Sequence, residues 1–152
     1  MESKVIINRE WAMPNKNTFS IPPIRELIDR YGAGGWVDPF PFPFREDALI
    51  YLSKFPDCSV ENLLYDPLYS PRQLKECYDA KGECLHDTTS AVWKRWKGAI
   101  ARVVKPGGIV ISFGRSTNGI GIARGFKIRE ILLVAHGGNH NDTICTVEQK
   151  VM

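Results

Sequence analysis

The segment Asp66-Pro67-Leu68-Tyr69 contains the residue types in this chain best suited to chemistry. It follows the apolar run 60–65, which predicts a buried strand, and ligands of open α/β sheets bind beyond the carboxyl ends of strands. The Asp66 carboxylate and the Pro67 carbonyl could accept hydrogen bonds from an exocyclic amino group, while Tyr69 stacks on the base that carries it. Such positioning would aim the amino lone pair at an electrophilic methyl group. Taken alone, the four residues favour a plainer alternative, a strand-ending Asp-Pro turn with a packed tyrosine.

Alternating strand and helix patterns predict a mostly parallel sheet that is covered by helices on both faces. Strands are expected at 36–37, 60–65, 109–114, 128–135 and 143–150, and helices at 20–31, 47–55, 70–80 and 90–103. Ser20 is expected to cap the first helix, and the turn at 105–108 leads into the third strand. The last two strands, joined by 136–142, form an antiparallel hairpin.

Length and composition favour a single soluble domain over residues 1–152. Hydrophobic residues make up 43% and charged residues 24%, and the formal net charge is +3, which permits nucleic-acid contact without requiring it. The chain has no run of about 20 apolar residues and no signal-peptide pattern, so we expect a cytoplasmic protein with no membrane partner. The four cysteines are expected to be reduced, and a zinc site at Cys77, Cys84 and His86 is disfavoured because no CxxC pair exists. No metal is expected.

Several motifs follow one another in the order used by a known family. Thr18-Phe19-Ser20 precede a helix, Asp38-Pro39-Phe40 follow a short strand, Asp47 begins a helix, and Asp66 to Tyr69 follow another strand. In this order the chain resembles the adenine-specific (N6/N4 amino) DNA methyltransferases, whose signature at the last position is Asp-Pro-Pro-Tyr. The closing hairpin, 136–143, looks like that of phage and prophage members.

The resemblance implies a Rossmann-like class I methyltransferase sheet and transfer of a methyl group from S-adenosylmethionine to adenine N6 in DNA. Asp66, Pro67, Leu68 and Tyr69 would form the catalytic loop. The cofactor would be bound by Thr18, Phe19, Ser20, Asp38, Pro39, Phe40 and Asp47. Because no separate target-recognition region is visible, specificity would be loose or would come from a homo-oligomer or a recognition subunit.

Two departures from the family pattern keep other functions open. Leu68 replaces the second proline of the signature, which relaxes the backbone near the Pro67 carbonyl. Between Phe40 and Asp47, about twenty residues of the family pattern are missing, roughly one strand and one helix with the glycine-rich turn and the ribose-binding acid. Either the domain is truncated by a natural loss of this unit, or the sequence omits a disordered segment. The alternative function is a catalytically degenerate methyltransferase fold acting as a nucleic-acid- or protein-binding module. Methylation of another amino group ranks last, since enzymes of that kind more often have Asn at the position of Asp66.

Three other features are interpreted structurally. The glycine-rich stretch 114–125 lacks a Walker ending and is expected to be a flexible loop at the sheet edge, where Arg115 and Arg124 could touch phosphates. His136 and His140 are expected to shape the hairpin loop. Trp93 and Trp96 are expected to pack in the core and on a helix face.

Overall fold

The computed structural model describes residues 4–15, 17–32, 35–40, 46–67, 91–138 and 140–152. Within these residues one five-stranded sheet has the order β1-β4-β5-β3-β2. The strands are β1 (Ile6–Trp11), β2 (Val60–Tyr65), β3 (Val104–Gly114), β4 (Phe126–Ala135) and β5 (Thr143–Lys150).

Four of these five strands point in the same direction. Strand β1 is parallel to β4 and β2 is parallel to β3, while β5 lies between β3 and β4 and is antiparallel to both. Val37 adds a parallel bridge to Leu63 on the outer side of β2, where the sequence predicts a short strand. The mixed α/β fold and the antiparallel C-terminal hairpin are therefore confirmed, and the sheet is consistent with a Rossmann-like class.

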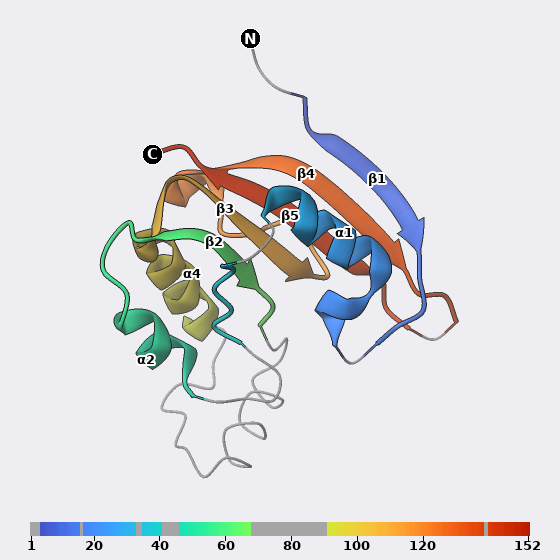
Figure 1. The fold of residues 1–152 in the computed structure, drawn as a ribbon, viewed down its shortest axis with the longest axis horizontal. Helices are drawn as coiled ribbons and strands as arrows, with labels where there is room; N and C mark the ends of the chain where they lie inside the picture. Colours follow the sequence, from blue (N-terminus) through green and yellow to red (C-terminus); the bar gives the residue numbers. More distant parts are fainter. Residues whose placement is uncertain (1–3, 16, 33–34, 41–45, 68–90, 139) are drawn as a thin grey trace.

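Helices cover both faces of the sheet (Figure 1). Helix α1 (Pro22–Tyr31) lies on one face, while α2 (Ala48–Ser53) and α4 (Ala91–Val103) pack together on the other. Strand β2 serves both layers, because Leu63 faces the core under α4 and Leu64 faces the core under α1. Burying a leucine side chain contributes roughly 1.5–3 kcal/mol, so the alternation along β2 stabilises both layers at once. None of the described helices is long and apolar enough to cross a membrane.

Strand β1 is an edge strand that the sequence does not reveal. All six of its residues are exposed, including Ile6, Ile7 and Trp11. Its place is set by pairing with β4, more than a hundred residues later in the chain. A strand whose two faces are both exposed has no alternating pattern to detect.

A buried carboxylate ties α1 to the sheet. Glu130 on β4 is 1% exposed at its side chain and accepts hydrogen bonds from Arg30 at 2.7 Å and from the Tyr31 hydroxyl at 2.7 Å. Burial alone would raise the pKa of Glu130, but the hydrogen bonds from Arg30 and Tyr31 outweigh it and lower the pKa. These contacts fix α1 across its face of the sheet.

Two local expectations are wrong. Helix α1 begins at Pro22 with Ile21 as its N-cap, while the Ser20 hydroxyl donates to the Asn17 carbonyl at 2.8 Å and stabilises the preceding 3-10 turn, η1 (Thr18–Ser20). Residues 105–108, where a turn is expected, are part of β3. The strand is irregular there: its register shifts relative to β2, and Gly107 has a positive φ of 85°. The helix expected at 70–80 lies outside the described residues.

The loop after β3 is anchored and does not leave from the sheet edge as expected, because β3 is an interior strand. The Glu148 carboxylate on β5 accepts hydrogen bonds from the backbone N–H groups of Ile120, at 2.7 Å, and Gly121, at 3.0 Å. Ile120 is buried in the core under α4, and η2 (Ile122–Arg124) follows it. A buried acceptor on the last strand therefore binds two amides of a loop that the sequence predicts to be flexible.

We expect Gly119→Ala to destabilise the protein by about 2 kcal/mol or more. Gly119 has a φ of +53°, and a Cβ there would meet the Glu148 carboxylate. Urea unfolding of the two proteins measures the difference. Gly98→Ala is the matched control, because Gly98 lies in α4 with open space around it, and this change should stabilise the helix by about 1 kcal/mol. Equal stability of Gly119→Ala and the parent would contradict the anchoring by Glu148.

Candidate functional site

Asp66 lies directly beyond the last residue of β2, at the carboxyl end of the strand as predicted. Burial and the nearby charge of Asp38 raise the pKa of Asp66 to about 7, although a hydrogen bond with Thr18 opposes the shift. A carboxyl with this pKa exchanges its proton near neutral pH. Within the segment 66–69, Asp66 is therefore the side chain that could gain or lose a proton near neutral pH. Leu68 and Tyr69 lie outside the described residues.

Asp38 approaches Asp66 because Val37 pairs with Leu63 on β2. The Val37 N–H donates to the Asn62 carbonyl at 3.0 Å, and the Leu64 N–H donates to the Val37 carbonyl at 2.8 Å. Burial raises the pKa of Asp38, while a hydrogen bond from the Phe40 N–H, at 2.9 Å, opposes the shift. Two desolvated carboxyl groups thus lie at adjacent strand ends.

The turn η1, which precedes Asp38 by about twenty residues, completes this cluster. It brings Thr18 to Asp66, and the Phe19 ring packs edge-on against Phe113 at a centroid distance of 5.1 Å. The structure therefore brings together three of the predicted segments, around Thr18, Asp38 and Asp66. We refer to Thr18, Asp38 and Asp66 as the carboxyl cluster.

The carboxyl cluster is suited to a cation. No lysine or arginine among the described residues forms an ion pair with Asp38 or Asp66. Cys145 contributes no nucleophile, because burial and the Asp66 charge raise the pKa of its thiol. A cationic ligand would relieve the repulsion between the two carboxylates and favour their ionised forms.

Four other residues predicted to bind the cofactor, Ser20, Pro39, Phe40 and Asp47, make structural contacts outside the carboxyl cluster. Phe40 packs edge-on against Tyr65 at 5.8 Å and Trp96 at 4.7 Å, in the core under α4. Pro39 is buried, and the Ser20 hydroxyl is bound to Asn17. The Asp47 carboxylate caps α2 by accepting from the Leu49 N–H at 2.8 Å and the Ile50 N–H at 3.2 Å. Asp47 therefore has a structural role in addition to the proposed one.

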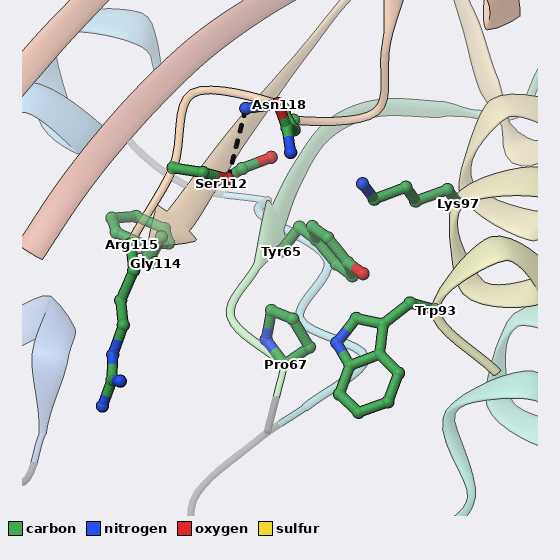
Figure 2. A pocket seen from close by; sticks show the side chains of 11 residues that line it. Tyr65, Pro67, Trp93, Lys97, Ser112, Gly114, Arg115 and Asn118 are labelled. Atoms are coloured by element: carbon green, nitrogen blue, oxygen red, sulfur yellow. Dashed lines mark hydrogen bonds between the residues drawn. The ribbon is translucent and has the colours of Figure 1, made fainter. Parts of the chain in front are cut away.

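A cavity that the sequence did not predict lies beside Pro67 (Figure 2). Its volume is about 330 Å³, and Tyr65, Trp93, Lys97 and Ser112 are among its lining residues. Pro67 is buried and forms part of its wall. The sequence carried no signal for this cavity, since its residues come from β2, β3, α4 and the segments that follow β2 and β3, and they meet through strand register.

The histidine interpretation is confirmed for His136. It is buried, with Nδ1 at 2.9 Å from the Ala12 carbonyl and Nε2 at 2.8 Å from the Thr143 hydroxyl, so it fastens the hairpin to the segment after β1. His140 is exposed in the same loop. Within the described part of the chain, no group of three or more metal-type side chains gathers. The cysteine and histidine residues at 77, 84 and 86 lie outside it.

Comparison with known proteins gives structural neighbours only. No protein-family model matches the chain, and no curated protein matches it significantly. Two crystal structures of a "putative DNA modification methylase" from Thermus thermophilus are similar, each with a TM-score of 0.46. The native structure shares 17% identity over 70% of this chain, and the selenomethionine derivative shares 18% over 77%. The aligned part of this chain spans 52% and 54% of those chains, about half of their length.

We expect Asp66→Asn to remove much of the pH dependence of stability. Because the folded-state pKa of Asp66 is raised from 3.8 to about 7, the native state binds more protons than the unfolded state between these values. Native stability therefore falls as pH rises from about 4 to 7, by at most about 4 kcal/mol for this group. Asp66→Asn should match the parent near pH 4 and exceed it above pH 7, as measured by urea unfolding.

Asp142→Asn is the control for this measurement, since Asp142 is exposed in the hairpin loop. Its unfolding free energy should follow that of the parent at every pH. Parallel pH profiles for the parent and Asp66→Asn would show that Asp66 is not a desolvated carboxyl in the folded protein.

Proposed function

We propose that this chain is an S-adenosylmethionine-dependent methyltransferase that acts on adenine N6 in DNA. The observation that carries the proposal is the carboxyl cluster at the end of β2. Thr18, Asp38 and Asp66 belong to three of the motifs on which the family resemblance rests, and they meet although they are far apart in the sequence. The common direction of four strands also fits a ligand site beyond their carboxyl ends.

The charge of the cluster fits the proposed cofactor. S-adenosylmethionine carries a positive sulfonium, and the two desolvated carboxyl groups have no cationic partner among the described residues. Thr18, Phe19 and Ser20 would hold one side of the cofactor, and Asp38, Pro39, Phe40 and Asp47 the other. When bound, the cofactor would supply the electrophilic methyl group.

The catalytic loop would orient the amino group of adenine. Asp66 and the Pro67 carbonyl would accept its two hydrogens, and Tyr69 would stack on the flipped base. A carboxylate acceptor favours the lone-pair geometry needed for attack, so Asp66 acts in its ionised form and a nearby cation assists it. Leu68 stands at the position of the family's second proline in this loop.

A degenerate methyltransferase fold that binds nucleic acid or protein is the second candidate. The sequence observation that favours it is the short connection from Phe40 to Asp47, which leaves no glycine-rich turn and no ribose-binding acid, together with Leu68. This candidate predicts no cofactor binding. The first candidate predicts cofactor binding and methyl transfer.

The proposed enzyme is cytoplasmic and takes DNA as its partner. A second copy of the chain or a separate recognition subunit would supply sequence specificity, as inferred from the absence of a target-recognition region between 70 and 128 in the sequence. A phage or prophage origin is part of the same proposal and rests on the closing hairpin.

Methyl transfer from labelled S-adenosylmethionine to duplex oligonucleotides tests the proposal. We expect label in adenine-containing duplexes and at least a ~100-fold loss of turnover in Asp66→Ala, because an acceptor that positions the amino group is removed. Asp142→Ala is the matched control and should keep full turnover.

The substrate is assigned with two further duplexes. One has N6-methyladenine at every adenine and the other lacks adenine, and both should stay unlabelled. Label in the adenine-free duplex, or equal turnover of Asp66→Ala and Asp142→Ala, would contradict the proposed chemistry.

A further inference from the structure

Three hydroxyl side chains form a buried row across the sheet. Tyr65 on β2 pairs in register with Ser112 on β3, and Ser112 pairs with Thr146 on β5. Residues paired in register lie on the same face of a sheet, and Tyr65 belongs to the core under α4. We call Tyr65, Ser112 and Thr146 the hydroxyl row.

The hydroxyl row has no hydrogen-bond partners among the residues that the structure describes. The three residues are 4%, 7% and 0% exposed, and the Tyr65 Oη, Ser112 Oγ and Thr146 Oγ1 atoms are all buried and unpartnered. An unsatisfied buried polar group typically costs about 1–3 kcal/mol. Three such groups side by side are unexpected in a core, and two of them belong to Tyr65 and Ser112, which line the cavity beside Pro67 where a ligand would satisfy them.

Lys97 lies above this row on α4. It lines the same cavity as Tyr65, Ser112 and Trp93, and Figure 2 shows its side chain extending toward the Tyr65 ring. No ion pair of Lys97 occurs among the described residues. Burial and the charge of Arg124 lower the pKa of Lys97, while Glu148 opposes the shift. Lys97 and Arg115 are the charged residues among the described residues that line the cavity, so the lining is cationic.

Two charged groups near Lys97 lie outside the lining, Glu148 and Arg124, and their opposite charges leave this sign unchanged. The Glu148 carboxylate accepts hydrogen bonds from two backbone amides of the loop, and the residue is 1% exposed. Arg124 donates to the Ile120 carbonyl at 3.2 Å and still contributes its charge. The guanidinium of Arg115 points away from Lys97 in Figure 2. The wall formed by the loop after β3 is held in place by Glu148, so the cavity is preorganised.

We propose that this cavity binds a phosphate group, whose oxygens accept hydrogen bonds from Lys97, Tyr65 and Ser112. Hydroxyl donors and an ammonium match the acceptor oxygens of a phosphate. The cavity volume of about 330 Å³ is larger than one phosphate, and Trp93 in its wall offers a ring for an attached nucleoside. The site lies on the α4 face of the sheet, whereas Asp66 is hydrogen-bonded to Thr18 and its charge acts on Cys145, which belongs to the core under α1. Pro67 borders both this cavity and the proposed methyl-transfer site, so the two sites adjoin, but phosphate binding by Lys97, Tyr65 and Ser112 does not require methyl transfer.

Titration at constant ionic strength tests this proposal, with inorganic phosphate and a 12-nucleotide single-stranded DNA as the probes. We expect saturable phosphate binding, followed through tryptophan fluorescence. Lys97→Met should weaken it at least about tenfold, since a charge-assisted hydrogen bond contributes about 1.5–3 kcal/mol. Lys94→Met is the matched control, because Lys94 is exposed on the same helix one turn away. Its affinity for phosphate should stay close to that of the parent.

Tyr65→Phe separates binding from folding. Phenylalanine fills the same core space and removes an unpartnered hydroxyl, so the variant should be at least as stable as the parent without phosphate. Phosphate should then raise its melting temperature less than that of the parent. Lack of saturable binding would overturn the proposal, as would equal losses in Lys97→Met and Lys94→Met.

The two probes distinguish the source of the phosphate. If phosphate competes with the oligonucleotide and Lys97→Met weakens both, the site binds the backbone of a nucleic-acid strand. If phosphate binds and the oligonucleotide does not, the site takes a free or small-molecule phosphate. Binding of S-adenosylmethionine is measured in the same variants and should be unchanged by Lys97→Met. Failure of cofactor binding with phosphate binding intact would overturn the proposed function alone.

Discussion

The position of β5 between β3 and β4 is the constraint on which the rest of the described structure depends. The final strand hydrogen-bonds to both neighbours and so joins β2 and β3, under α4, to β4 and β1. Its side chains serve both layers, since Cys145 and Val147 face the core under α1 and Glu148 holds the loop after β3. Lys150 at its end donates to the carbonyls of Ala101, at 2.6 Å, and Val104, at 2.7 Å. The cationic side chain thereby secures the carboxyl end of α4.

Two consecutive residues at the end of β2, Tyr65 and Asp66, have their side chains on opposite faces of the sheet. Alternation along the strand sends Tyr65 toward α4 and Asp66 toward Thr18 and Cys145. The first residue contributes a buried hydroxyl to an electropositive cavity, and the second contributes a carboxyl whose pKa lies near 7. A register shift of one residue in β2 would exchange these faces and abolish both arrangements.

The sequence was sufficient where local pattern and burial agree. Strands 60–65 and 143–150 have the predicted bounds, and Asp66 lies at the predicted strand end. It was insufficient where long-range pairing decides the outcome. Strand β1 has no buried residue, so its sequence has no alternating apolar pattern that would predict its pairing with β4. The hydroxyl row depends on the relative register of three strands, and the contact of Thr18 with Asp66 depends on the path of η1, so neither follows from spacing along the chain.

The central claim is that the carboxyl cluster binds S-adenosylmethionine, and calorimetric titration of the purified chain with this cofactor tests it most directly. The account predicts micromolar binding that is weakened by Asp38→Asn, because this change removes a carboxylate that complements the sulfonium. Asp142→Asn, in the exposed hairpin loop, should bind as the parent does. An absence of binding at millimolar cofactor would contradict the claim and leave the degenerate binding module as the function of this fold.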